Sequence, residues 1–200
     1  DRPCKAGGEV ILLIDLCYRE GSLGFDEYVL PVARIVERSG FETRSVHFHR
    51  VTGAVFAGAE AVILCGTPLA DNAFLKEQEA FSWLKTSEIP VIGVCAGMEM
   101  VCKTFGGLLG PCTEIGMTEI RVIGSDPVLS EFPSFSAYEL HTLACTYPGV
   151  LEVLAVSDCC IQVVKHPGRP VYGVMFHPEV RNEWVVERFL SLVRKDRFSP

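Results

Sequence analysis

Short apolar runs alternate with segments of helical spacing in the first half of the chain, and this order limits the possible folds most strongly. The runs predict buried strands at residues 10–15, 43–48, 61–65 and 90–94. The intervening helical patterns lie at residues 26–39, 74–85 and 96–105. Asp26 is a candidate helix cap, and Gly40 and Gly106 are candidate stops. Strands with two apolar faces that alternate with helices predict a parallel sheet covered on both sides.

The second half of the chain has a different pattern, with short strand-like segments separated by tight turns. These segments lie at residues 115–123, 136–141, 151–157, 161–165 and 171–176. A last helix is expected over residues 183–194. The chain shows no internal repeat, low-complexity segment or linker, so we expect one domain over residues 1–200.

Composition excludes several classes of protein. With 48% hydrophobic and 22% charged residues, the chain is typical of a globular protein. The formal charge of −7 and the lack of a Lys/Arg-rich run argue against nucleic-acid or anionic-membrane binding. No apolar stretch approaches the roughly 20 residues that span a bilayer. Residues 1–9 contain no apolar signal core, so we expect a cytoplasmic protein.

Nine cysteines are present, an odd number without a CxxC pair. A secreted disulfide framework favours short chains with paired spacings, so we expect a reducing cytosol and mostly buried thiols. Cys102, seven residues after Cys95 on the same expected helix, is interpreted as a packing residue.

Cys95 differs from the other cysteines because of its neighbours. It follows the most apolar strand, precedes a helix, and has Gly93 and Gly97 two positions to either side. This is the pattern of a nucleophile elbow, in which a sharp turn lifts the side chain towards solvent at a helix N-terminus. Such a position favours a thiolate. A glycine-flanked turn with an incidental buried cysteine explains the elbow pattern equally well.

His177 is the strongest candidate for a partner base. It ends an apolar strand, and Glu179 lies two positions later with Pro178 between them. The carboxylate can therefore orient the imidazole towards the thiol. His166 also precedes a proline but has no acid nearby, so we interpret it as a turn residue.

His47 and His49 alternate on an expected strand and could be two metal ligands. No third ligand has suitable spacing, so we interpret both as structural residues.

These motifs together resemble the class I glutamine amidotransferases, the family with a Cys-His-Glu triad. The matching segments are GVCAGM at 93–98, LCGTP at 64–68, FGG at 105–107 and YGVMFHPEV at 172–180. EIG at 114–116 and YELH at 138–141 fall where the family has its middle motifs. The likeness runs from about residue 10 to residue 192. Within the family, the length of the chain and the sequence of residues 163–179 are most similar to those of a branch of free-standing subunits.

The resemblance implies a flavodoxin-like α/β fold, with a mostly parallel sheet, helices on both faces and a small antiparallel addition in the C-terminal half. It implies that Cys95, His177 and Glu179 form the triad that hydrolyses glutamine to glutamate and ammonia. Oxyanion donors would be the backbone amides of Thr67 and Ala96. The substrate-binding residues would be Gly66, Glu99, Leu140, His141 and Thr142.

An ATP-using synthetase partner would receive the ammonia, and such subunits are usually weak glutaminases until the partner docks. No phosphate-binding loop is present, so the ATP step belongs to another chain. No metal or organic cofactor is expected.

Several positions depart from the family pattern. Glu99 stands where the family usually has glutamine, and Thr67 where it has glycine. Leu140, Leu143 and Met175 replace a small polar residue, an acid and a glutamine, respectively. Two alternatives therefore remain beside the amidotransferase: a stand-alone hydrolase of another γ-glutamyl compound, and a catalytically silent binding protein on the same scaffold.

Overall fold

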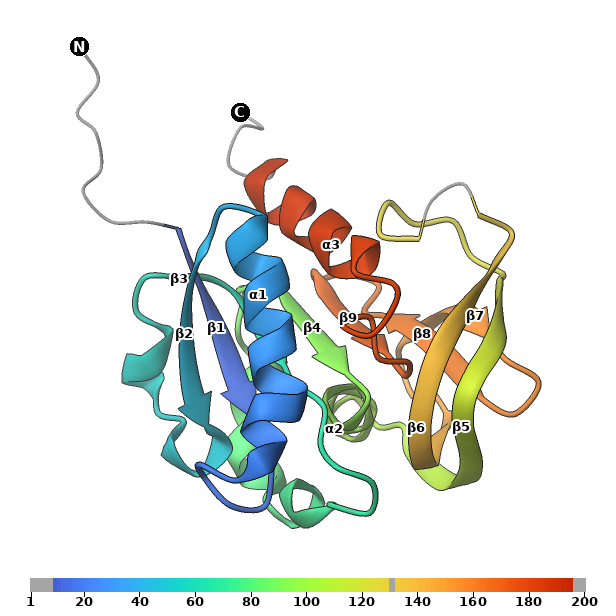
Figure 1. The fold of residues 1–200 in the computed structure, drawn as a ribbon, viewed down its shortest axis with the longest axis horizontal. Coiled ribbons are helices and arrows are strands. Elements are labelled where there is room, and N and C mark those ends of the chain that lie inside the picture. Colours follow the sequence, from blue (N-terminus) through green and yellow to red (C-terminus); the bar gives the residue numbers. More distant parts are fainter. Residues whose placement is uncertain (1–8, 130–131, 196–200) are drawn as a thin grey trace.

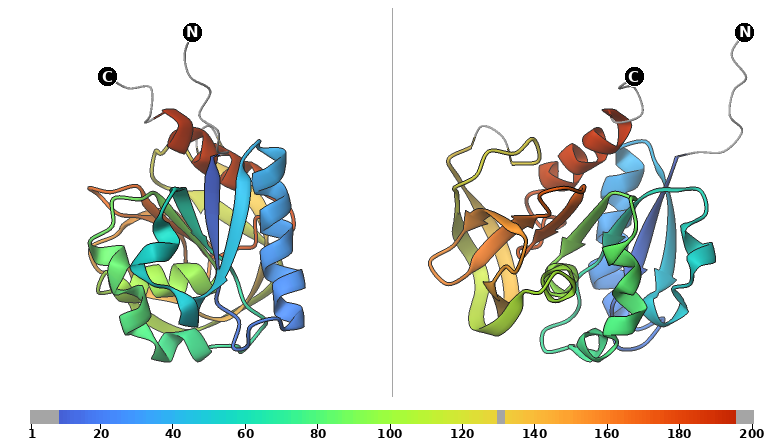
Figure 2. Two further views of the ribbon diagram at one scale, coloured as in Figure 1. Left: turned by 90° about the vertical axis from the view of Figure 1, so that its left-hand side faces the viewer. Right: turned by 180° about the vertical axis from the view of Figure 1, so that it is seen from behind.

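The computed structural model describes residues 9–129 and 132–195, which form one continuous mixed sheet flanked by helices (Figures 1 and 2). Nine strands are found in this part of the chain, in the order β2-β1-β3-β4-β9-β8-β7-β5-β6. The first five strands in this order are parallel: β2 (Glu42–His47), β1 (Val10–Asp15), β3 (Ala59–Leu64), β4 (Val91–Val94) and β9 (Val171–Val174). The remaining four are antiparallel: β8 (Ile161–Lys165), β7 (Glu152–Val156), β5 (Leu108–Val122) and β6 (Ser134–Tyr147).

This arrangement confirms the flavodoxin-like α/β fold expected from the sequence, although the antiparallel part is larger than the small addition that was expected. Strands β5 and β6 contain 15 and 14 residues and pair along nearly their whole length. Strand β6 extends beyond the predicted strand in both directions and β5 only towards its N-terminus, because the two strands pair with each other along these extensions. The two strands form a long ribbon beside the parallel half (Figure 1).

Helices cover both faces of the parallel half. Helices α1 (Leu30–Arg38) and α3 (Trp184–Lys195) contact each other on one face. Helix α2 (Ala96–Thr104) packs on β4 and β9, beside the 3₁₀ segment η5 (Gln78–Lys85), on the other (Figure 2). Among the described residues, no helix is both long and apolar enough to cross a membrane.

Two predicted helices differ in detail. Helix α1 is preceded by a π-turn, η1 (Phe25–Val29), whose cap position is Gly24, so the prediction that Asp26 is the cap is wrong. The segment expected at 74–85 forms two 3₁₀ segments, η4 (Ala73–Lys76) and η5, separated by Glu77 with φ −105° and ψ 42°. The remaining short 3₁₀ segments are η2 (Phe48–Arg50) and η3 (Gly53–Phe56).

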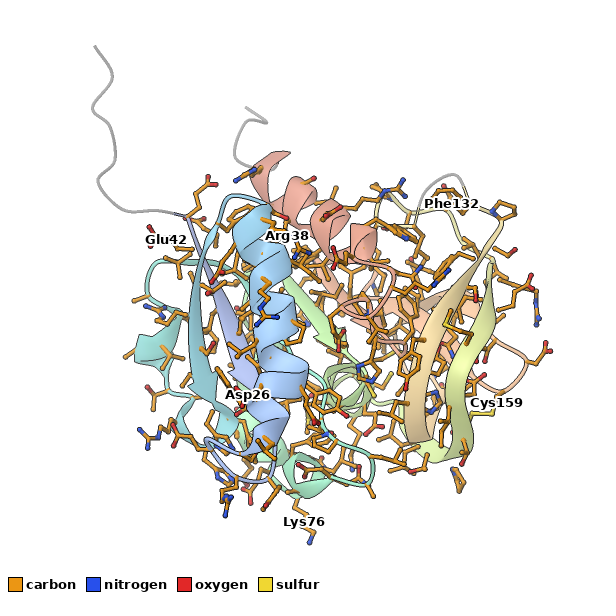
Figure 3. All side chains as sticks on the ribbon, in the orientation of Figure 1. Asp26, Arg38, Glu42, Lys76, Phe132 and Cys159 are labelled. Atoms are coloured by element: carbon orange, nitrogen blue, oxygen red, sulfur yellow. A yellow bond between two sulfur atoms is a disulfide. The ribbon has the colours of Figure 1, made fainter. Side chains whose placement is uncertain are left out.

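Apolar side chains fill the space between the sheet and its helices (Figure 3). The apolar residues of β1 and β3 that face the helices have no exposed surface, among them Leu12, Ile14 and Ile63. Burial of each such side chain contributes about 1.5–3 kcal/mol. The central strands are therefore held rigidly, and their carboxyl ends are fixed relative to one another.

The prediction that the cysteines are mostly buried thiols is correct for five of them and wrong for two. Cys17, Cys65, Cys95, Cys102 and Cys145 are buried and free, and Cys160 is half-buried and free. Cys112 and Cys159 form a disulfide between β5 and the β7–β8 turn. The spacing of 47 residues contains no motif, and strand pairing alone brings the two residues together. Residues 1–8, which include Cys4 and most of the segment examined for a signal core, lie outside the described residues.

The turn between β4 and α2 depends on two glycines. A Cβ at Gly93 would lie 2.4 Å from the carbonyl of Gly97, and a Cβ at Gly97 would lie 2.4 Å from the carbonyl oxygen of Leu64. Real Cβ atoms do not approach backbone so closely, so only glycine allows α2 to start this near β3 and β4.

We therefore expect Gly93→Ala to lower the free energy of unfolding by several kcal/mol, on the order of an overpacked core position. The measurement is urea unfolding followed by circular dichroism. Gly53→Ala is the matched control, because a Cβ at Gly53 meets nothing within 4 Å. Equal midpoints for the two variants would show that the turn is not closely packed.

Candidate active site

Cys95 occupies the sharp turn that the sequence predicts between β4 and α2. Its φ of 48° and ψ of −103° lie in a region that side-chain-bearing residues rarely adopt. Its N–H donates to Val174 on the neighbouring strand (2.8 Å), and its carbonyl accepts from Glu99 in the first turn of α2 (3.0 Å). The strained backbone is thus held between the sheet and the helix, and this geometry matches the nucleophile elbow.

His177 and Glu179 come together just beyond β9, next to that turn. His177 Nδ1 lies 2.7 Å from Glu179 Oε1, and both side chains are almost fully buried. The His177 N–H donates to the carbonyl of Tyr138 on β6 (2.9 Å). Gly66 lies against the ring, since a Cβ there would be 2.9 Å from His177 Cε1. The imidazole is therefore fixed in position and orientation by β3, β6 and β9.

The charges of Cys95 and His177 influence each other. Burial lowers the pKa of His177, but the adjacent Cys95 and Glu179 outweigh it and hold that pKa well above its ordinary value. Burial raises the pKa of the Cys95 thiol above its ordinary value, and His177 opposes this shift only in part. The expectation that the turn lifts this side chain towards solvent and favours a thiolate is therefore wrong, because the thiol is nearly fully buried. His177 Nε2 makes no hydrogen bond of standard geometry to a described residue. This nitrogen is thus available to exchange a proton with the thiol, whose Sγ lies 3.8 Å from the Leu140 carbonyl.

A narrow cavity adjoins Cys95, with a volume of about 20 Å³, enough for about one water. Its walls come from the 67–72 loop, the start of α2 and strand β6. The lining residues are Thr67, Pro68, Leu69, Ala70, Asn72, Cys95, Ala96, Glu99, Leu140, His141, Thr142 and Leu143. The sulfur is only slightly exposed, since Cys95 retains 4% of its accessible surface. Cys95 therefore lies in a narrow space between the 67–72 loop, α2 and β6.

The site residues expected from the sequence are brought to one place. Thr67, Ala96, Glu99, Leu140, His141 and Thr142 line the cavity, and Gly66 packs on the imidazole instead. The Ala96 N–H opens α2 and has no acceptor within its own helix, so it can serve an incoming oxyanion.

Sequence reasoning missed the wall formed by Leu69, Ala70 and Asn72. Ala70 has a φ of 66°, and Thr67 Oγ1 donates to the Asp71 carbonyl (3.0 Å) to shape this loop. The LCGTP motif ends at residue 68, so it gives no information about the residues that form this wall.

Glu99 is a buried carboxyl group at the floor of the cavity. It retains 4% of its accessible surface, and its Oε2 has no hydrogen-bond partner among the described residues. Burial raises the pKa of Glu99 to about 8, although His141 opposes the shift. The carboxyl group is therefore mostly neutral at pH 7.

His141 connects the cavity to the β5–β6 ribbon. Its Nε2 lies 3.2 Å from both Glu114 Oε2 and Glu139 Oε2, and its Nδ1 lies 3.1 Å from the Cys112 carbonyl. Burial lowers the pKa of His141, but Glu139 and Glu114 outweigh it and produce a net increase. The His141 imidazole, between the carboxyl groups of Glu114 and Glu139, contributes to one wall of the cavity.

The remaining histidines lie elsewhere. His166 occupies a turn, where its Nδ1 accepts from Gly168 N–H (3.1 Å). His47 Nε2 lies 2.7 Å from the Cys17 carbonyl, which accounts for its burial. His49 N–H donates to His47 Nδ1 (3.4 Å), in keeping with a structural role for this pair.

Comparison with known proteins agrees with this geometry. The family model for Glutamine amidotransferase class-I matches residues 25–190. The chain is 35% identical over 146 residues to the glutamine-hydrolysing GMP synthase subunit of Methanothrix thermoacetophila, covering 68% of this chain and 78% of that protein. The corresponding protein of Methanococcus maripaludis is 35% identical over 126 residues, which are 60% of this chain and 65% of that one.

Solved structures share the fold. A protein from Thermoplasma acidophilum, described as a GMP synthase subunit, superposes with a TM-score of 0.82 at 20% identity, covering 96% of both chains. A glutamine amidotransferase from Thermotoga maritima gives a TM-score of 0.69 at 19% identity, covering 97% of this chain and 87% of that one.

The buried Glu99 predicts a pH-dependent stability that Glu99→Gln removes. The pKa of this carboxyl is 4.5 in the unfolded chain and about 8 in the folded chain. Folding therefore takes up a proton between these values, and the contribution of Glu99 to stability falls as pH rises from about 4.5 to 8. We expect Glu99→Gln to be more stable than the parent by on the order of 2–3 kcal/mol at pH 7.

Thermal or urea unfolding at pH 5 and pH 8 measures this difference. The advantage of Glu99→Gln should grow with pH, whereas the exposed control Glu119→Gln should differ little from the parent at either pH. A constant difference across the range would mean that Glu99 is already ionised in the folded protein.

Proposed function

The chain belongs to the Glutamine amidotransferase class-I family, and from this premise we propose that it hydrolyses the side-chain amide of glutamine and passes the ammonia to a synthetase partner. The observation that carries the proposal is the strained Cys95 turn next to a His177 imidazole whose other nitrogen is held by Glu179. This arrangement supports Cys95 as nucleophile, His177 as base and Glu179 as the orienting acid of covalent catalysis. We propose that residues 1–200 form a single domain for this reaction.

In the first half of the reaction, the Cys95 sulfur attacks the carbonyl carbon of the glutamine side-chain amide. A carbon–sulfur bond forms, and His177 holds the proton that the thiol gave up. That proton goes to the departing nitrogen as the carbon–nitrogen bond breaks, which releases ammonia and leaves a thioester. The N–H groups of Thr67 and Ala96 stabilise the negative oxygen of the tetrahedral intermediate.

In the second half, His177 accepts a proton from water as the water oxygen attacks the thioester carbon. The carbon–sulfur bond breaks, glutamate leaves, and the thiol regains its proton. Glu179 keeps the imidazole aligned through both halves and stabilises its positive form.

The environment of Glu99 supports glutamine as the substrate. The family usually has a neutral amide at this position, and a buried carboxyl with a pKa of about 8 is also mostly neutral at pH 7. A protonated carboxyl has one donor and one acceptor oxygen, so it can replace an amide in a hydrogen-bonded pocket. Gly66, Leu140, His141 and Thr142 complete the proposed binding shell.

The narrow cavity supports dependence on a partner. The space beside the sulfur is narrow and Cys95 is nearly fully buried, so the 67–72 loop or the β6 wall moves in this proposal when the substrate binds. A docking synthetase can stabilise the open form, because a ligand shifts a conformational equilibrium towards the state that it binds.

The identity of the partner is proposed from the relatives. Two relatives that are 35% identical are named as glutamine-hydrolysing subunits of GMP synthase. The sequence of residues 163–179 resembles the free-standing subunits of the family, which supports the same partner. We therefore propose that the ammonia serves the ATP-using synthetase of GMP synthase, in purine biosynthesis, in the cytoplasm. A stand-alone hydrolase of another γ-glutamyl compound is the second candidate, favoured by Leu140 and Leu143 in the cavity wall.

Cys95→Ala should abolish glutamate release from glutamine, both alone and with the synthetase component of GMP synthase, because no sulfur remains to form the thioester. The parent should release glutamate, and the partner should increase the rate. A panel of γ-glutamyl amides and peptides identifies the preferred substrate. No glutamate from the parent under any condition would contradict the proposal, and a better substrate than glutamine would favour the second candidate.

Glu179→Gln should keep the fold and lower kcat by about 10²–10⁴-fold, because the imidazole loses its orienting charge. The surface variant Glu183→Gln, which removes only the exposed ion pair with Arg38, is the matched control and should retain the parental kcat. Circular dichroism and a melting curve establish that both variants are folded. A parental kcat in Glu179→Gln would mean that another group orients His177.

A further inference from the structure

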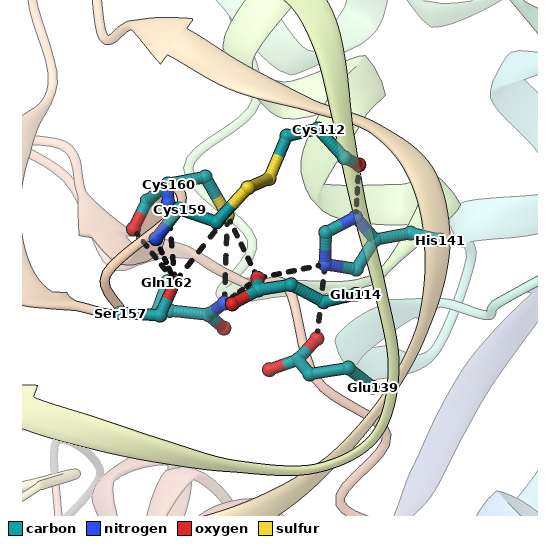
Figure 4. The surroundings of a disulfide bond; sticks show 8 residues. All are labelled: Cys112, Glu114, Glu139, His141, Ser157, Cys159, Cys160 and Gln162. Carbon is teal, nitrogen blue, oxygen red and sulfur yellow. Dashed lines mark hydrogen bonds and ion pairs between the residues drawn. A yellow bond between two sulfur atoms is a disulfide. The ribbon is translucent and has the colours of Figure 1, made fainter.

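A second cluster of reactive side chains lies where β5 meets the β7–β8 turn, adjacent to His141 (Figure 4). Cys160 Sγ lies 3.3 Å from Glu114 Oε2. Gln162 Nε2 contacts both groups, at 2.9 Å from Glu114 Oε2 and 3.4 Å from Cys160 Sγ. Cys112, which forms the disulfide with Cys159, completes the cluster, and Figure 3 places Cys159 at the edge of the ribbon.

Three of these side chains present donor atoms at close range. The sulfurs of Cys112 and Cys160 and a carboxylate oxygen of Glu114 all lie within 4.8 Å of one another. A tetrahedral zinc ion with bonds of about 2.0–2.3 Å needs ligand atoms roughly 3.3–3.8 Å apart, so only a small contraction is required. Thiolate and carboxylate donors are among the ligands that Zn²⁺ prefers.

The cluster is largely buried. Gln162 has no exposed surface and Cys112 retains 7% of its own, while the Glu114 side chain retains 10% and Cys160 is half-buried. Among the described residues, the only basic group in ion-pair range of Glu114 is His141, which Glu139 shares. Glu114 therefore has no positive partner of its own, and its oxygen can turn to a metal ion.

The amide of Gln162 holds two of these groups at close range. Its Nε2 donates to Glu114 Oε2 and lies near Cys160 Sγ, and the side chain is fully buried, so the carboxylate and the sulfur have little freedom to separate.

We propose that this cluster is a redox-gated Zn²⁺ site, with Cys112, Cys160 and Glu114 as ligands and water in the fourth position. The disulfide excludes the metal because it occupies the sulfur of Cys112. A dithiol reductant opens the site: the sulfur–sulfur bond breaks, the dithiol becomes a cyclic disulfide, and Cys112 and Cys159 become thiols. Zn²⁺ then binds and displaces one proton from each of the Cys112 and Cys160 thiols. Cys159 is the gate and not a ligand.

Cys159→Ser tests the proposal in the full chain, because it prevents the Cys112–Cys159 bond and leaves all three ligands in place. Cys159→Ser and the reduced parent are prepared with a phosphine reductant, which is removed anaerobically before the metal is added, and the oxidised parent is never exposed to reductant. Co²⁺ serves as a spectroscopic probe, with Zn²⁺ affinity obtained by competition. We expect Cys159→Ser and the reduced parent to bind one ion with a thiolate-to-cobalt absorption band. The oxidised parent should lack this band.

Ligand variants on the Cys159→Ser background give the second arm. Adding Cys160→Ser or Glu114→Gln should weaken Zn²⁺ binding by at least about 10–100-fold, since even outer-shell partners have effects of that size. Cys102→Ala is the matched control, because it removes a buried thiol outside the cluster and should leave the affinity unchanged. Equal binding by oxidised and reduced parent, or unchanged affinity in both ligand variants, would overturn the proposal.

Two readouts do not depend on the folding of the double variants. Zn²⁺ should raise the melting temperature of Cys159→Ser, because an ion that binds only the folded chain stabilises it. X-ray absorption of the bound zinc should show two sulfur and two oxygen neighbours. No rise in melting temperature, or a zinc ion without sulfur neighbours, would contradict the site even if glutamine hydrolysis proceeds as proposed.

Discussion

The close approach of α2 to strands β3 and β4 is the constraint on which the site depends. It exists because Gly93 and Gly97 place no side chain between the helix and the backbone of Leu64. With the helix this near, the chain has no room for a relaxed connection, and Cys95 takes a positive φ of 48°. The surrounding packing maintains this strain, because strain persists only where the rest of the structure over-determines the backbone. The position of the α2 N-terminus beside Cys95 and the orientation of the sulfur both follow from it.

The antiparallel ribbon contributes as much to the site as the parallel half. Tyr138 holds the backbone of His177, and Leu140, His141 and Thr142 form a cavity wall. These residues occupy consecutive positions along β6, so the ribbon supplies a rigid surface against which the elbow faces. The same ribbon, through Glu114 and Cys112 on β5, connects the cavity to the cluster of thiols.

Local sequence patterns were sufficient for the strands of the parallel half, the elbow and the His177–Glu179 pair. In each case the signal lies within a few neighbouring residues: an apolar run, two glycines around Cys95, and a carboxylate two positions after His177. The family resemblance then indicated which remote segments meet at the cavity.

Features that depend on contacts between distant segments could not be read in this way. The Cys112–Cys159 bond joins residues 47 positions apart, and neither residue has a motif around it. The loop wall around Ala70 depends on an unusual backbone conformation, and the neutral state of Glu99 depends on burial. Strands β5 and β6 are longer than predicted because their additional residues are fixed by pairing with each other, which a local pattern does not show.

The adjacency of β4 and β9 has a consequence for how the site can vary. Cys95 immediately follows β4, His177 follows β9 by three residues, and the Cys95 N–H donates to Val174 at the end of β9. The pairing of these two strands therefore sets the relative position of the nucleophile and the imidazole. Insertions or deletions in the loops between residues 105 and 170 leave this pairing intact, whereas the β6 stretch that holds His177 through Tyr138 and forms the wall at residues 140–142 has to keep its place.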